Sequence, residues 1–243
     1  MKGKTFFDFH VSSDAVSTLK QCGYSGCVVF EDTNKSDRAG ITSTSESLDT
    51  MDAPCITSCT SVPDLDLDFS VSTGIEIHAK NESALIKLVD NARKRVDVVA
   101  VYGGSESLNR AACKDSNVDV LVHPETEKDG GINHVIAKEA REHGVAIEFD
   151  LSRLIVLRGP SRMKAISDFR VNLMLARKYD VDIVLVSNAK TPYDVRMPRE
   201  LVALAGLFGM HPDEACRAMY DVPLRIFKEQ SSGYISDGVE IIE

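Results

Sequence analysis

The stretch DVVAVYGGSESLNRAACKDSNVDVLVH, residues 97–123, decides the fold class of this sequence. It starts with a run of β-branched apolar residues, which ends at two glycines and a polar turn. A segment of helical character follows, and a second apolar run closes the stretch. A strand, a helix and a second strand in this order are the repeating unit of a parallel β-sheet.

The same alternation continues along the chain. Apolar runs predict eight strands, at residues 5–11, 26–31, 54–59, 74–79, 97–102, 118–123, 144–149 and 181–187. Helical periodicity lies between them, for example in residues 132–140 and, after Pro160, in residues 163–173. Pro198 and Pro212 begin two further predicted helices, because proline suits the first turn of a helix.

These elements predict an α/β fold, a TIM-barrel-like (β/α) barrel of the class that the PHP phosphoesterases share. We expect one domain over residues 1–228, since no break in composition divides it. Residues 32–73, rich in Ser, Thr and Asp, are either an irregular loop or weakly marked βα units. Residues 229–243 hold four acidic and no basic residues and are expected to be an acidic C-terminal extension.

Charge is distributed unevenly over the 243 residues. The formal net charge is −9, yet residues 153–228 hold 13 Lys and Arg against 8 Asp and Glu. We call residues 153–228 the basic segment. The overall sign argues against a protein that coats nucleic acid, whereas one basic segment is compatible with a local RNA site.

Composition also limits the cellular compartment in which we expect the protein. No run approaches the roughly 18 apolar residues of a membrane span, and the apolar stretch near the N-terminus is too short for a signal peptide. The six cysteines form no CxxC pair, which predicts reduced, structural thiols. We therefore expect a cytoplasmic protein without a membrane partner.

The two glycines of the opening stretch are a candidate phosphate site. A backbone without Cβ atoms, followed by the free N–H groups of a helix start and by a cation, suits a phosphate group. The candidates are Gly103, Gly104, Asn109 and Arg110. The alternative interpretation is a tight turn that needs glycine for its conformation alone.

Several ionisable residues lie on predicted strands. Asp8 and His10 resemble the HxH metal motif of PHP phosphoesterases, but the first histidine is replaced and the other histidines are scattered, so we predict no metal site. The two side chains are alternatively polar groups at the barrel mouth that bond each other. His123 ends a strand where barrel active sites lie, and it serves either as a binding residue or as a strand-end cap. Glu76 and Glu148 are either structural ion-pair partners or acid–base groups.

The basic segment supplies the other candidate RNA contacts. These are Arg158, Arg162, Lys164, Arg170, Arg177, Arg196 and Arg199. Arginine in such positions either binds phosphate or lies along the edge of the core with its charged head in water.

Five longer stretches, taken together, carry a resemblance to a known family. They are GGSESLNRAACKDSNVDVLVHPE, GGINHVIAKEAREHGVAIEFDLSRLI, RVNLMLARKYDVDIVLVSNAK, PYDVRMPRELVALAGLFGM and VPLRIF. In this order and spacing the sequence resembles the ribonuclease P subunit family that contains archaeal protein component 3 and the eukaryotic 30 kDa subunit. The resemblance runs from about residue 74 to 228 and includes the first predicted strand, TFFDFHV, at residues 5–11.

The resemblance implies a barrel that belongs to the ribonucleoprotein which removes the 5′ leader from precursor tRNA. In that family the RNA subunit performs the hydrolysis with bound Mg²⁺, so the resemblance implies a chain that binds no cofactor and has no catalytic residue of its own. The implied partners are the ribonuclease P RNA, protein component 2 and the other ribonuclease P proteins, with precursor tRNA contacted indirectly. The phosphate at the candidate residues is then an RNA phosphate.

Two rival functions and one open question accompany this interpretation. The rivals are an autonomous PHP-like metal-dependent phosphoesterase and a barrel enzyme that acts on a phosphorylated metabolite. The open question concerns the apolar residues Leu201, Leu204, Leu207, Phe208 and Met210, which either contact component 2 or pack in the core.

Overall fold

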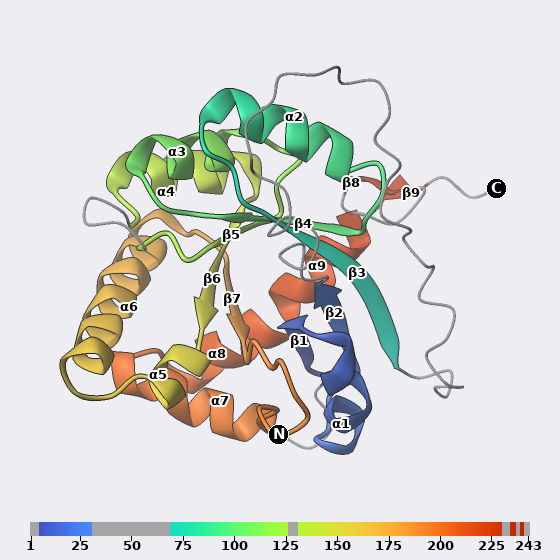
Figure 1. Cartoon of the computed structure of the whole chain (residues 1–243), viewed down its shortest axis with the longest axis vertical. Helices are drawn as coiled ribbons and strands as arrows, with labels where there is room; N and C mark the ends of the chain where they lie inside the picture. Colours follow the sequence, from blue (N-terminus) through green and yellow to red (C-terminus); the bar gives the residue numbers. More distant parts are fainter. Residues whose placement is uncertain (1–4, 31–68, 126–130, 230–233, 237–238, 241–243) are drawn as a thin grey trace, which may run out of the picture.

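The computed structural model describes residues 5–30, 69–125, 131–229, 234–236 and 239–240. Within these residues, seven strands form one sheet in the order of the chain, and every neighbouring pair is parallel (Figure 1). The strands are β1 (Phe7–Val11), β2 (Gly26–Phe30), β3 (Ser70–Ile77), β4 (Val98–Tyr102), β5 (Val120–Val122), β6 (Ala146–Asp150) and β7 (Ile183–Val186). Each coincides with or overlaps a predicted apolar run, and the predicted strand at 54–59 lies outside the described residues.

The sheet curves into a nearly closed barrel. Its first and last strands meet at a bridge between Val11 and Ala189, next to which the Ser12 N–H donates to the Ala189 carbonyl at 2.9 Å. The Ser187 N–H also donates to the Asp8 carboxylate at 3.0 Å. The predicted α/β barrel is confirmed, with seven strands rather than eight in the part that the structure describes.

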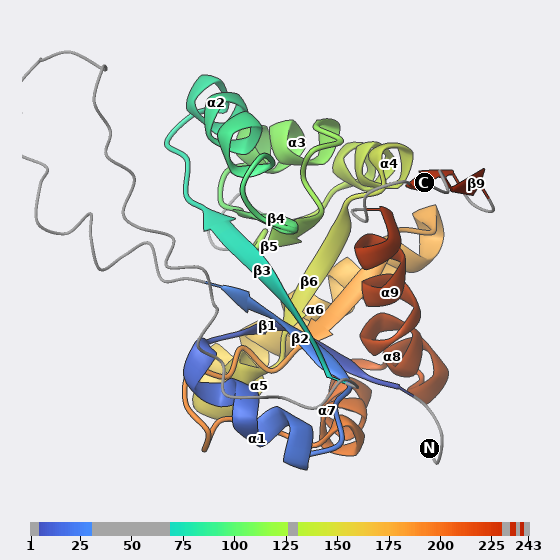
Figure 2. The same ribbon diagram turned by 90° about the vertical axis from the view of Figure 1, so that its right-hand side faces the viewer.

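Helices surround the barrel (Figures 1 and 2). They are the 3-10 helices η1 (Ser13–Ala15) and η4 (Gly206–Phe208), and the α-helices α1 (Val16–Gln21), α2 (Glu82–Ala92), α3 (Glu106–Lys114), α4 (His134–His143), α5 (Ser152–Val156), α6 (Gly159–Tyr179), α7 (Pro198–Ala205), α8 (Pro212–Met219) and α9 (Asp221–Glu229). Prolines lie in the first turn of α6, α7 and α8, as the sequence predicts. No described helix is both long and apolar enough to cross a membrane.

The last helix completes the interior of the barrel. The inner faces of the strands form one apolar cluster, to which α9 contributes Val222 and Ile226. The Phe227 ring of α9 packs against Phe7 and Phe9 of β1, with centroid distances of 5.3 and 5.5 Å. Because Phe7 is the first residue of β1, α9 covers the amino end of that strand. The opposite, carboxyl end of the barrel, which we call the barrel mouth, is polar.

The chain continues past α9 in a short antiparallel pair, β8 (Tyr234–Ser236) and β9 (Val239–Glu240). The division into a domain at 1–228 and an extension at 229–243 stays a prediction.

Candidate nucleic-acid interface

The two glycines after β4 form a turn whose donors are already used. The Gly103 N–H donates to the Val122 carbonyl at 2.7 Å, and the Gly104 N–H donates to Asn109 Oδ1 at 2.9 Å. The amide nitrogen of Asn109 donates to the Pro124 carbonyl at 2.9 Å, and Asn109 is fully buried. A Cβ atom at Gly103 would lie 2.6 Å from Asn109 Oδ1, which explains the glycine. The geometry supports the tight-turn interpretation for Gly103, Gly104 and Asn109.

Arg110 is different, because it faces solvent. Its side chain is 49% exposed on α3, and its Nη2 lies 3.8 Å from Oε1 of Glu139 on α4. Lys114 Nζ lies 3.7 Å from the same oxygen. One carboxylate thus faces two cations, and Arg110 remains a candidate for contact with an RNA phosphate.

The barrel mouth is organised around His10. Its Nδ1 lies 3.0 Å from Glu148 Oε2 on β6, and its Nε2 lies 3.8 Å from Glu76 Oε2 on β3. The imidazole stacks on Phe30 with a centroid distance of 4.1 Å. Glu76 and Glu148 are therefore ion-pair partners, one of the two interpretations that the sequence left open. The His10 side chain has these partners, whereas the Asp8 carboxylate accepts from Ser187 on the other side of the strand closure.

Burial and charge set the protonation of these two groups. Burial by itself would lower the pKa of His10, but the Glu148 carboxylate, with Glu76 and Asp150 near it, outweighs burial and raises that pKa to about 9. His10 is thus an imidazolium at neutral pH. Burial raises the pKa of Asp8 to about 6, against the hydrogen bonds from Ser187 that favour the charged form.

His123 belongs to a second set of pairs in the mouth. It follows β5 with a φ of 48°, and its Nε2 lies 3.5 Å from Asp150 Oδ2. The Asn188 amide donates to the same carboxylate at 2.9 Å, and Arg153 pairs with Glu125 beside it. His123 thus lies at the strand end as predicted, in a strand-end network of polar groups.

A metal centre at the barrel mouth would be the feature that this chain shares with the PHP phosphoesterases. Within the described residues, no three His, Cys, Asp or Glu side chains are placed to hold a metal ion. Histidines of the mouth instead face carboxylates: His10 lies between Glu148 and Glu76, and His78 Nε2 lies 2.6 Å from Glu76 Oε1. These pairs stabilise the closed barrel end.

Four of the predicted RNA contacts in the basic segment are arginines that bond backbone carbonyls and pair with no acid among the described residues. Arg158 donates to the Leu157 carbonyl at 3.1 Å, and Arg162 donates to the Leu157 and Ile155 carbonyls at 2.9 and 3.2 Å, so that both bind the carboxyl end of α5. Arg170 and Arg196 bond the Leu207 and Tyr193 carbonyls in the same way. A carbonyl orients a guanidinium without neutralising it, and the five N–H groups of each arginine leave donors for a phosphate.

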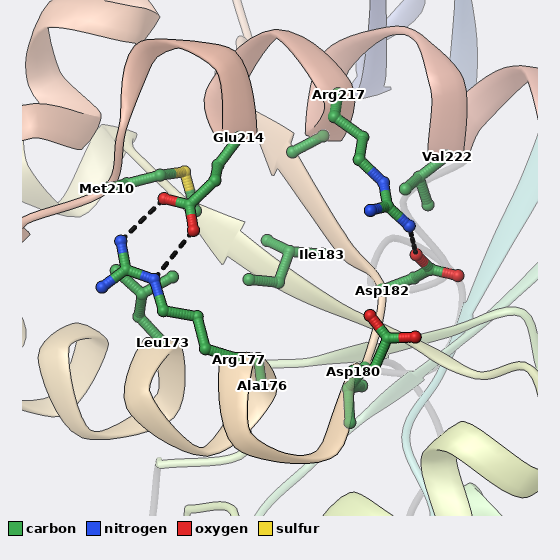
Figure 3. A pocket seen from close by; sticks show the side chains of 12 residues that line it. Leu173, Ala176, Arg177, Asp180, Asp182, Ile183, Met210, Glu214, Arg217 and Val222 are labelled. Atoms are coloured by element: carbon green, nitrogen blue, oxygen red, sulfur yellow. Dashed lines mark hydrogen bonds and ion pairs between the residues drawn. The ribbon is translucent and has the colours of Figure 1, made fainter.

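Two other predicted contacts are neutralised by acids. Lys164 pairs with Asp168 at 2.9 Å along α6. Arg177 forms two bonds to Glu214, at 2.8 and 2.7 Å, across the pocket between α6 and α8 that Figure 3 shows. The hydrogen bonds from Arg177 hold the pKa of the Glu214 carboxyl below its usual range. Arg217 and Asp182 form a further pair in this pocket. Lys164 and Arg177 thus contribute less to a positive surface than the four carbonyl-bound arginines.

The loop between β7 and α7, residues 187–197, carries residues that the sequence did not single out. Tyr193 is 90% exposed, and Lys190, three residues earlier in the chain, is also exposed. Arg199 is exposed on the first turn of α7. The sequence pattern that could have indicated a binding site here is KTPYDVRMPR, residues 190–199, in which an aromatic residue lies between cations in a polar segment that contains proline.

The apolar residues after Pro198 are mostly core. Leu201, Phe208 and Met210 are at most 4% exposed, and Leu204 is half-buried. Leu207 alone of the five is exposed, at 49%. Of the two interpretations left open by the sequence, core packing holds for the three buried residues.

Comparison with known proteins gives the family. The profile of the family described as RNase P subunit p30 matches residues 5–232. The chain is 49% identical over 177 residues to ribonuclease P protein component 3 of Methanococcoides burtonii, and the aligned region covers 72% of this chain and 73% of that protein. It is 39% identical over 249 residues to the protein of the same name from Methanosarcina barkeri, covering 98% and 96%. The chain belongs to the p30 family of ribonuclease P subunits.

Solved structures agree on the fold. A chain of an archaeal ribonuclease P determined with mature tRNA has a TM-score of 0.73 and 24% identity, covering 99% of this chain and 98% of that one. The ochratoxinase of A. niger superposes with a TM-score of 0.57 and 14% identity, and the aligned region covers 91% of this chain and 71% of the ochratoxinase chain. Both comparisons support the barrel.

Proposed function

We propose that this chain is the p30-type protein subunit of ribonuclease P, which binds and supports the catalytic RNA of the enzyme that removes the 5′ leader from precursor tRNA. Membership of the p30 family supports the proposal, as do relatives that bear the name ribonuclease P protein component 3. In this proposal the chain works in the cytoplasm, and Mg²⁺ is held by the RNA.

The observation that carries RNA binding is the chemistry of Arg158, Arg162, Arg170 and Arg196. All four are bonded to backbone carbonyls and keep their full positive charge. Phosphate contacts need local positive charge with oriented donors, and they fix the position of a protein on RNA without reading its sequence. An acidic chain with net charge −9 can therefore bind RNA through a restricted surface.

The mouth supports a role without chemistry of its own. His10 is tied to Glu148 and Glu76, and His123 is tied to Asp150, so these groups stabilise one another. A phosphoesterase of the PHP kind needs several ligands that converge on a metal, and the described mouth instead holds histidine–carboxylate pairs.

The proposal includes protein component 2 as the partner. The exposed face of α6 is a described surface that suits a protein contact, because Met163, Val171 and Met174 are 63, 47 and 60% exposed along one helix. Leu207 of η4 is also exposed, and Arg170 of α6 donates to its carbonyl. Apolar side chains that recur on one exposed helix face are typical of protein interaction sites.

Reconstitution tests the function directly. Ribonuclease P RNA and the companion proteins are assembled with and without this chain, and cleavage of precursor tRNA is measured. We expect the chain to raise RNA-dependent cleavage and to have no activity in the absence of the RNA. Cleavage by the purified chain alone, lost in the His10→Ala variant, would instead establish the phosphoesterase rival.

A further inference from the structure

The loop between β7 and α7 is held firmly from several sides. Ser12 Oγ donates to the Lys190 carbonyl at 2.8 Å, and Tyr24 Oη donates to the Arg196 carbonyl at 2.8 Å. Within the loop, the N–H and hydroxyl of Thr191 donate to one oxygen of Asp194 at 3.0 and 2.8 Å. These bonds fix the backbone of the loop against β1 and the segment before β2.

The fixed loop presents Tyr193 to solvent. At 90% exposure, Tyr193 is the most exposed of the large apolar and aromatic side chains in the described part of the chain. Its carbonyl accepts from Arg196 Nη1 at 2.8 Å, so the backbone that carries the ring is held in place as well. A tyrosine ring exposed to water does not contribute the stabilisation that its burial would give. Because the backbone that carries the ring is held in place, binding of a ligand to the ring costs less conformational entropy.

The segment that carries the ring holds more cations than acids. Lys190 and Arg199 are exposed on either side in the sequence, and Arg196 keeps its charge because its partners are carbonyls. Residues 188–200 hold three cations, Lys190, Arg196 and Arg199, against two acids, which is a net charge of +1. Asp194 accepts from the Thr191 N–H, and Glu200 accepts from the Met197 N–H at 2.9 Å. An aromatic ring between cations is the arrangement that binds single-stranded RNA, because a base stacks on the ring while phosphates meet the cations.

We propose that Tyr193 is a stacking platform for an unpaired RNA base, with the flanking phosphates bound by Lys190 and Arg199. The inference rests on the proposed RNA-binding function and adds a site and a ligand class to it. A protein anchor is the less suitable occupant, since such aromatic anchors lie within a rim of contacts that excludes water. The neighbours of Tyr193 in the loop, Thr191 and Asp194, are polar and exposed.

The test measures binding of the chain to ribonuclease P RNA over a salt series, with and without component 2. The variants are Tyr193→Ala, Tyr193→Phe and Lys190→Ala, and Ile86→Ala on α2, 52% exposed, is the matched control. Tyr193→Ala should weaken binding roughly 5- to 100-fold with an unchanged salt slope, because stacking involves no counterion release. Tyr193→Phe should bind like the wild type, since the ring suffices. Lys190→Ala should lower the salt slope by about 0.7.

The outcomes separate the inference from the function on which it rests. If the wild type binds RNA and Tyr193→Ala binds equally well, the stacking site is wrong and the RNA-binding function stands. If the wild type fails to bind RNA both with and without component 2, the proposed function is wrong. Loss of component 2 binding by Tyr193→Ala in the absence of RNA would show a protein anchor instead. Should this variant unfold, photocrosslinking of wild-type chain to RNAs that contain 4-thiouridine or 6-thioguanosine decides: a crosslink at Tyr193 supports the stacking site, and the absence of one with both RNAs would overturn it.

Discussion

His10 Nδ1 and Glu148 Oε2 lie 3.0 Å apart, which connects β1 to β6 at the barrel mouth although these strands are not neighbours in the sheet. Both side chains are nearly buried, with exposures of 10 and 1%. The pair therefore joins β1 to β6 across β7, and its ionic contribution to stability is present while His10 carries its proton.

Stability should fall with pH because of this pair. The pKa of His10 is about 9 in the folded protein and 6.5 as the reference value, so between these values the folded state holds a proton that the unfolded state has lost. The stabilisation is fully present below pH 6.5 and is lost as pH rises through 9, by up to about 3 kcal/mol. Urea unfolding at a series of pH values measures it.

The His10→Gln variant should lose this dependence, so that its free energy of unfolding approaches that of the wild type as pH rises above 9. The same substitution at His134, which is exposed on α4, is the control and should leave the profile unchanged. Asp8 contributes a separate decline between pH 3.8 and about 6, since its raised pKa also makes the folded state the tighter proton binder. Equal slopes between pH 6.5 and 9 for wild type and His10→Gln would refute the role of the pair.

Asn109→Ala should destabilise the fold. The variant leaves the buried Gly104 N–H without its partner, at a cost of about 1 to 3 kcal/mol, and removes one of the two donors to the Pro124 carbonyl, which keeps the Gly131 N–H. Asn91→Ala on the exposed face of α2 is the matched control, expected within about 0.5 kcal/mol of the wild type. A wild-type free energy of unfolding for Asn109→Ala would show that water satisfies these groups.

Gly103→Ala and Gly206→Ala should have opposite effects. The new Cβ at residue 103 would lie 2.6 Å from Asn109 Oδ1 and 2.8 Å from Pro124 Cα, whereas nothing lies within 4 Å of a Cβ at residue 206. Because Gly206 has helical dihedral angles, alanine there should stabilise by about 0.4 to 1 kcal/mol. Thermal unfolding of the two variants provides the comparison, and similar melting temperatures would contradict the close packing at Gly103.

Removing an uncompensated cation should change RNA binding more than removing a neutralised one. Arg158→Ala and Arg170→Ala, at two carbonyl-bound arginines, should each lower the slope of log affinity against log salt by about 0.7 to 0.9. Arg177→Ala should change the slope less, because Glu214 already neutralises that guanidinium. Binding to ribonuclease P RNA is measured after each variant shows wild-type thermal unfolding. Equal slopes for all three variants would mean that the carbonyl-bound and the acid-bound arginines do not differ in RNA contact.

Ile226→Ala should show that α9 is part of the barrel core. Ile226 is 1% exposed and packs in the cluster that fills the barrel, so its truncation should cost about 2 to 5 kcal/mol. Ile86→Ala on α2, where the side chain is 52% exposed, should cost about 0.5 kcal/mol or less. Urea unfolding of both variants measures the difference, and a small effect at Ile226 would place α9 outside the cooperative core.

The sequence by itself determined the class of fold and the family. Strand runs such as VVAVY and helix starts such as Pro160 and Pro212 follow from local rules, because β-branched residues and proline act on the backbone that carries them. The same linear order of motifs indicated the p30 family, which the match over residues 5–232 confirms. The positions of His10 and His123 at the barrel mouth could also be predicted from the sequence, because the carboxyl ends of parallel strands lie at the same end of a barrel.

Only the tertiary structure decided what these groups contact. His10 meets Glu148 across 138 residues of chain, and Arg177 meets Glu214 across 37, so strand register and helix packing select the partners. Asn109 and Arg110 are adjacent in the sequence, yet one is buried in a turn and the other faces solvent. The exposure of Tyr193 likewise depends on loop bonds to Ser12 and Tyr24 from distant elements. The local sequence pattern determines which segments become helices and strands. The burial of a charged side chain, and the partner that neutralises it, depend on the residues that the fold places within a few ångströms of it.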